Sequence, residues 1–77
     1  MTKNEIAKEI EYRLGIDTKE VRIYKGRYFA IEPTPIEYGY WIHEIFIKGL
    51  EIDFRIVNEV SSMKEVEEYF KATFEWL

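Results

Sequence analysis

The segment from Trp41 to Val57 constrains the fold most, because apolar and polar side chains alternate along it and Lys48-Gly49 interrupts the alternation. A period of two is typical of a β-strand, and a short glycine-containing break between two such runs predicts a hairpin turn. With Lys48 and Gly49 in the turn, one face consists of the facing pairs Ile47 and Leu50, Ile45 and Ile52, His43 and Phe54, and Trp41 and Ile56. The opposite face consists of the pairs Phe46 and Glu51, Glu44 and Asp53, Ile42 and Arg55, and Tyr40 and Val57. The first face is the predicted core face, and the second mixes acids with large apolar groups.

A second hairpin is predicted from Val21 to Ile31, because Lys25-Gly26 interrupts this segment in the same way. Its facing pairs are Val21 with Ala30 and Ile23 with Tyr28 on one face, and Arg22 with Phe29 and Tyr24 with Arg27 on the other. Residues 32–37 contain two prolines, which hold an extended path and cannot donate fully to a ladder. We therefore expect this stretch to connect the two hairpins.

Helices are predicted at both ends of the chain. Thr2 and Glu5 have the spacing of a capping box, apolar residues follow at helical spacing, and Gly15 supplies a stop, which predicts a helix over residues 3–14. Ser62 and Glu65 repeat the capping pattern before a second helix. The apolar stripe of that helix consists of Met63, Val66, Phe70, Thr73 and Leu77. The order predicts an α+β fold, α-β-β-β-β-α, in which a four-stranded antiparallel meander carries both helices on one face.

Length and composition point to one folded domain over residues 1–77. The chain is 47% hydrophobic and 17% aromatic, and disordered segments lack such residues. It contains no cysteine, its first residues are polar, and no apolar run is long enough to span a bilayer. We therefore expect a cytoplasmic protein that has no disulfide and does not associate with a membrane.

No catalytic or metal-binding pattern stands out. His43 is the only histidine and falls on the predicted core face, so a structural role is expected. The carboxylate pairs Glu44/Asp53 and Glu67/Glu68 have no predicted cleft between them, and two carboxyls need differently tuned environments for acid–base work. The sequence therefore predicts a protein without enzymatic activity, metal or cofactor.

The aromatic and acidic face of the predicted sheet is the candidate binding surface. With both helices on the other face, its bulky side chains would be in water, and such patches are typical of protein interfaces. Residues 1–31 carry seven bases and five acids, whereas residues 32–77 carry four bases and ten acids, so the second part is acidic and favours a basic protein partner. The candidate protein-binding residues are Tyr38, Tyr40, Glu44, Phe46, Glu51, Asp53, Glu65, Glu67 and Glu68.

Two alternatives and one structural objection remain open. The first hairpin interleaves cations with aromatic residues, so it could track phosphates while stacking bases of single-stranded nucleic acid. The candidate residues for that role are Arg22, Tyr24, Lys25, Arg27 and Phe29. The open face could instead join two copies of the chain in a homodimer or larger structural assembly. Alternatively, one helix could cross to this face and bury it.

In size, charge and composition the chain resembles the small acidic inhibitors that phages and mobile elements use against host nucleases, among them anti-CRISPR and anti-restriction proteins. The resemblance implies a stand-alone inhibitor that binds the basic, nucleic-acid-handling surface of another protein.

Overall fold

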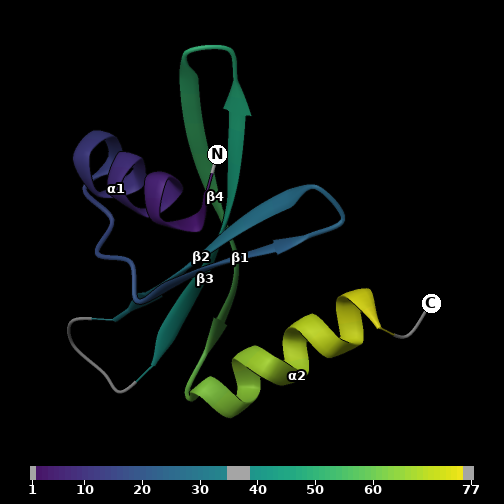
Figure 1. The fold of residues 1–77 in the computed structure, drawn as a ribbon. Helices are drawn as coiled ribbons and strands as arrows, with labels where there is room; N and C mark the ends of the chain where they lie inside the picture. The colour runs from purple at the N-terminus through teal and green to yellow at the C-terminus, as the bar shows by residue number, and fades with distance from the viewer. Residues whose placement is uncertain (1, 35–38, 76–77) are drawn as a thin grey trace.

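A computed structural model describes residues 2–34 and 39–75 and contains two helices and one four-stranded antiparallel sheet (Figure 1). The elements in chain order are α1 (Lys3–Leu14), β1 (Glu20–Tyr24), β2 (Arg27–Pro33), β3 (Tyr40–Lys48), β4 (Glu51–Val60) and α2 (Met63–Phe74). The strands lie side by side in the order β1-β2-β3-β4, which confirms the predicted α-β-β-β-β-α meander. Within the described residues, neither helix is long and apolar enough to cross a membrane.

Both helices begin at the predicted caps. In α1, the Thr2 side chain accepts a hydrogen bond from the Glu5 amide, and the Glu5 carboxylate accepts one from the Thr2 amide. Gly15 ends α1 in the left-handed region at φ 68°. In α2, Ser62 accepts from the Glu65 amide. The Glu65 carboxylate reaches one residue further back than in a capping box, where it accepts from the amide and the hydroxyl of Ser61.

The first hairpin has the predicted register, with Val21 facing Ala30 and Ile23 facing Tyr28. Lys25 and Gly26 form its two-residue turn with φ values of 49° and 76°. Positive φ at both central positions is the signature of a type I′ turn, which matches the twist of the flanking strands. β2 runs on to Pro33, so Glu32, predicted to lie in the connector, belongs to the strand.

The turn of the second hairpin lies one residue later than predicted, which moves every facing partner by two residues. Gly49 and Leu50 form the turn, and Lys48 faces Glu51. The observed pairs are Phe46 with Asp53, Ile45 with Phe54, Glu44 with Arg55, Ile47 with Ile52 and His43 with Ile56. Gly49 has φ 62° and takes the first central position, where a type II′ turn needs positive φ. Because side chains alternate with a period of two, this shift replaces the facing partners but leaves each residue on its predicted face.

A bulge then changes the register at the far end of this hairpin. His43 faces Ile56 whereas Ile42 faces Asn58, so Val57 is an extra residue in β4. Beyond the bulge Trp41 faces Glu59 and Tyr40 faces Val60, in place of the predicted Ile56 and Val57.

The two helices lie on opposite faces of the sheet, so the prediction that both cover one face is wrong (Figure 1). We call the two sides the α1 face and the α2 face. On the α1 face, Ile6 and Ile10 pack against Val21, Ala30 and Ile45. On the α2 face, the buried residues are Phe29, Ile31, Ile42, Val66 and Phe70. The physical reason is that both sheet faces carry large apolar side chains, and each needs its own apolar helix to exclude water.

Each helix covers only part of its face. A helix of 12 residues is about 18 Å long, whereas a strand of 9 or 10 residues spans about 30 Å. The end of the β3–β4 hairpin therefore extends past the helices, as Figure 1 shows for the upright hairpin.

The two Lys-Gly dipeptides give a matched pair of variants, because Lys25 lies in a turn whereas Lys48 ends a strand. Lys25→Asn should raise the free energy of unfolding by about 0.5–1 kcal/mol, because Lys25 holds a positive φ that asparagine adopts more readily. Lys48→Asn should lower it by a few tenths of a kcal/mol, because Lys48 is a strand residue opposite Glu51. Urea denaturation measures both. Equal effects of the two substitutions would contradict the assigned turns.

Candidate functional site

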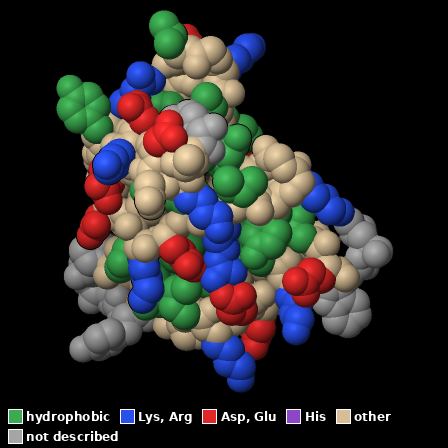
Figure 2. Space-filling model, in the orientation of Figure 1, with side chains coloured by type: hydrophobic (Ala, Val, Ile, Leu, Met, Phe, Trp, Pro, Cys, Tyr) green, Lys and Arg blue, Asp and Glu red, His purple; other side chains and the backbone are tan. Residues whose placement is uncertain are grey.

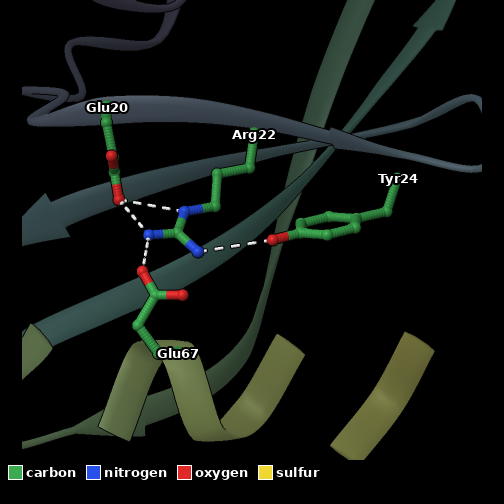
Figure 3. Close-up of polar contacts among 4 residues, drawn as sticks. All are labelled: Glu20, Arg22, Tyr24 and Glu67. Atoms are coloured by element: carbon green, nitrogen blue, oxygen red, sulfur yellow. Dashed lines mark hydrogen bonds and ion pairs between the residues drawn. The ribbon is translucent and has the colours of Figure 1, made fainter. Parts of the chain in front are cut away.

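Arg22 joins β1 to α2 (Figure 3). Its guanidinium donates to the Glu20 carboxylate at 3.0 and 2.8 Å and to the Tyr24 hydroxyl at 3.3 Å, and it also bonds to the Glu67 carboxylate of α2. It lies 5.3 Å from the centre of the Phe70 ring. The bond to Glu67 raises the pKa of Arg22 and lowers the pKa of Glu67. The positive charge of Arg22 is thus largely neutralised by Glu20 and Glu67 of the same chain.

Arg27 forms the second polar link on the α2 face. Its Nε and Nη2 atoms donate to the two carboxylate oxygens of Glu44, each at 2.8 Å, which is the bidentate geometry of a strong ion pair. The guanidinium also lies 5.4 Å from the ring centres of Phe29 and Phe74. Glu44 is only 5% exposed, and the hydrogen bonds from Arg27 hold the pKa of its carboxyl below the usual value. Glu44 is therefore a structural carboxylate that cannot meet a partner.

The residues considered for nucleic-acid binding are mostly engaged inside the molecule. Phe29 is buried, and Tyr24 stacks on Phe70 and Phe74 at ring distances of 4.8 and 4.9 Å. Arg22 and Arg27 hold the carboxylates described above. Lys25 is exposed at the turn. Two of the aromatic rings needed for base stacking are thus turned into the core.

The predicted aromatic anchors are separated from one another. Tyr40 is half-buried at the α2 core, and the Lys19 ammonium lies 5.3 Å from its ring centre. Ile42 beside it is fully buried, so the expectation of an open face is wrong for this half of the sheet. Phe46 lies beyond α2, is 44% exposed and has the Arg55 guanidinium over its ring. Tyr38 lies outside the described residues.

The predicted acidic residues also divide into two groups. Glu44, Glu65 and Glu67 bond to Arg27, Ser61 and Arg22, respectively. The pKa of Glu65 is lowered by hydrogen bonds from the Ser61 amide and hydroxyl. The exposed acids that remain from the prediction are Glu51, Asp53 and Glu68. The negative surface open to a partner is therefore smaller than the sequence suggested.

The apolar surface that the sequence reasoning missed lies on the β3–β4 hairpin. Several large apolar side chains predicted to be core are more than a third exposed: Ile47, Leu50, Phe54 and Ile56. Hydrophobic side chains are visible at the end of this hairpin and along its flank in Figure 2. The signal was present in the sequence, because a helix of about 12 residues cannot cover a face that carries so many apolar residues along long strands.

A small hollow adjoins this surface. It has a volume of about 220 Å³ and lies between α1 and the hairpin end. Its lining includes Ile47, Leu50 and Ile52 together with the Glu9–Arg13 ion pair of α1. The Arg13 guanidinium donates to the Leu50 carbonyl at 2.6 Å and so ties the turn to the helix.

His43 is buried, as predicted, but has a partner that was not predicted. Its Nε2 lies 2.9 Å from the Glu32 carboxylate, and its Nδ1 has no hydrogen-bond partner among the residues that the structure describes. The rings of Trp41 and Phe54 pack edge-on around it at 6.4 and 5.5 Å. Among residues 2–34 and 39–75, no three or more histidine, cysteine or acidic residues come together in a way that could hold a metal ion. The His43–Glu32 contact joins β2 to β3, because Glu32 lies on β2 and His43 on β3.

The Arg27–Glu44 pair gives a pH-dependent prediction. Because the folded-state pKa of Glu44 lies below the ordinary 4.5, its contribution to stability is complete above that pH and is lost as the pH falls through the lowered value. Glu44→Gln should lower the free energy of unfolding at pH 7 by about 1–2 kcal/mol and remove this part of the acid-induced loss. Denaturation from pH 7 to pH 3 measures both effects.

Arg27→Gln is the matched control. It leaves a buried carboxylate without its cation, so it should destabilise more than Glu44→Gln at neutral pH and recover part of that loss on acidification. Parallel pH profiles for wild type and both variants would contradict the assigned coupling.

No protein-family model matches the chain, and neither a curated protein nor a solved structure is significantly similar to it. Functional inference therefore depends on the surfaces described above. The β3–β4 hairpin combines exposed apolar side chains, a neighbouring hollow and exposed charges, and is the strongest candidate among them.

Proposed function

We propose that the protein is a non-enzymatic protein-binding module, and that the end of the β3–β4 hairpin is its contact surface. The observation that carries this proposal is the group of apolar side chains exposed at that end. Phe46 points from the α2 face, Ile47 from the α1 face, and Leu50 stands at the turn with 89% of its surface exposed. Contiguous exposed apolar side chains with a charged rim are typical of protein interfaces.

The hollow beside the turn strengthens the proposal. Interface energy concentrates in a few anchors that enter pockets on the other protein. Leu50 and Phe46 can act as anchors, while the hollow lined by Ile47 and Ile52 can receive one from the partner. Phe46, Ile47 and Ile52 lie on β3 and β4, so the backbone that carries them is already ordered before binding.

Charge supports a basic partner. The chain carries a net charge of −4, and Glu51 and Asp53 are exposed close to the apolar end of the hairpin. Net charge acts mainly on the rate of encounter, whereas the apolar anchors determine how long the complex lasts. Proteins that handle nucleic acid have basic clefts. We therefore propose to test first whether the protein inhibits such a protein, as anti-CRISPR and anti-restriction proteins do.

The test compares a double variant of the contact surface with a control variant at an exposed residue of α1. Phe46→Ala combined with Leu50→Ala should lower partner capture by immobilised protein at least tenfold, because it removes two anchors. Tyr12→Ala should leave capture unchanged, since Tyr12 on α1 is as exposed as Leu50 but lies outside the proposed contact surface. Quantitative mass spectrometry measures the amount of each partner bound by the variant relative to wild type, and circular dichroism checks that each variant is folded.

Retention of the same partners by the double variant would refute the hairpin as the contact surface. Binding of oligonucleotides that weakens with salt and is lost in Lys25→Glu would instead favour the nucleic-acid alternative.

A further inference from the structure

The outer edge of β4 is a strand edge that the described part of the chain leaves uncovered. Within residues 2–34 and 39–75, β4 is the last strand of the sheet and pairs only with β3. Its residues 53–56 are exposed one after another, although they alternate between the two faces, so neither helix shields this part of the strand. An exposed edge of this kind is a template for pairing with another strand.

Alternate residues of this edge direct their backbone groups away from β3. In antiparallel pairing, successive residues direct their amide and carbonyl groups alternately toward and away from the neighbouring strand. Lys48 and Glu51 flank the two-residue turn, so the odd-numbered residues of this part of β4 face β3 and Ile52, Phe54 and Ile56 face outward. The Phe54 amide agrees with this assignment, because it donates at 2.8 Å to the Asp53 carboxylate.

The sequence of this edge is complementary to itself. Residues 52–56 read Ile-Asp-Phe-Arg-Ile, with an apolar residue at each end, a phenylalanine at the centre and opposite charges on its two sides. When the segment is laid antiparallel on a copy of itself about Phe54, Ile52 meets Ile56 and Asp53 meets Arg55. Both symmetry-related halves of the pairing then gain one opposite-charge pair.

We propose that two copies of the chain associate through antiparallel pairing of their β4 edges, with Phe54 on the two-fold axis. The two four-stranded sheets then form one continuous sheet. This goes beyond the proposed function, since it requires no other protein. A two-fold axis perpendicular to the sheet makes the contact self-complementary and closed, which stops assembly at the dimer.

Charge selects this register over its neighbours. Centring the pairing on Asp53 would place two carboxylates opposite each other, and centring it on Arg55 would do the same with two guanidinium groups. Like charges directly across two strands are destabilising, whereas the register about Phe54 has only opposite charges at these positions.

The dimer also accounts for exposed apolar surface. The two-fold axis keeps the α1 faces of both copies on the same side, so Phe54 of one copy lies beside Phe54 of the other, and Ile56 lies beside Ile52 of the other copy. Phe54 and Ile56 are partly exposed in the single chain. Edge pairing therefore buries apolar surface as well as backbone groups.

A charge swap tests the register. Sedimentation of the wild-type protein should show a concentration-dependent monomer–dimer equilibrium. Arg55→Glu or Asp53→Lys alone should weaken dimerisation about tenfold, and the two substitutions together should restore it. Arg55→Glu places an acid opposite Glu44 within the same chain, in the single and in the double variant alike. Restored dimerisation of the double variant would therefore show that the loss in the single variant comes from the contact between copies and not from this repulsion within the chain. A wild-type monomer up to millimolar concentration would overturn the proposal, and so would a double variant that dimerises no better than the single ones.

Cross-linking tests the position of the axis. The chain has no cysteine, so Phe54→Cys introduces a single thiol next to its own copy, whereas Ile47→Cys introduces one of nearly equal exposure on the same hairpin. Mild oxidation should link Phe54→Cys into dimers at least tenfold faster than Ile47→Cys. Equal rates would place the axis elsewhere and refute the pairing. None of these measurements involves another protein, so failure of the dimer leaves the proposed function untouched.

Discussion

Burial of both faces of one small sheet is the constraint on which the rest of the structure depends. Phe29, Ile31 and Ile42 point to one side, and Val21, Ala30 and Ile45 point to the other. A single-layer covering would leave one of these sets in water, at about 25 cal/mol for each Å² of apolar surface. The chain resolves this by placing a helix of 12 residues on each side. Because these helices are shorter than β3 and β4, the same arrangement leaves the hairpin end uncovered.

Two arginines hold α2 on its face and explain why the acidic sequence does not give an equally acidic surface. Arg22 bonds to Glu67, and Arg27 lies between Glu44 and the ring of Phe74, so each guanidinium links the strands to the helix. These contacts use carboxylates that would otherwise attract a basic partner. The groups left for recognition are then mainly apolar, which moves the candidate contact surface from the centre of the sheet to the end of the hairpin.

Features of the fold with local determinants could be predicted from the sequence. Helix boundaries follow from caps at Thr2 and Ser62, and the first register follows from a turn with positive φ at Lys25 and Gly26. In the second hairpin the glycine occupies the first central position of the turn, and composition alone does not distinguish this from the second. The turn was predicted one residue too early, which displaces each facing partner by two residues, so the faces remained correct while every facing partner changed.

Features of the fold that depend on distant parts of the chain could not be predicted from the sequence for a different reason. The side of the sheet that α2 covers depends on the path after Val60, and the bulge at Val57 and the bond between His43 and Glu32 depend on strand pairing already being formed. The candidate anchor Tyr40 was wrongly placed on an open face because of the first of these. Phe46 stayed exposed because it lies nearer the turn than α2 reaches, a consequence of helix length that propensities do not express.

The β4 edge shows how the same chain can fold alone and still be able to associate. Natural edge strands commonly carry charges that discourage pairing, and Asp53 does this by occupying the outward amide of Phe54. Pairing about Phe54 replaces that bond with a backbone bond and turns the Asp53 carboxylate toward a guanidinium. The Phe54 amide has a hydrogen-bond partner both in the single chain and in the dimer, so the free energy gained on pairing is only the difference between these two bonds. Edge pairing of this kind is therefore reversible. An edge protected in this way allows the register with opposite charges and disfavours those that bring like charges together, which limits uncontrolled strand addition.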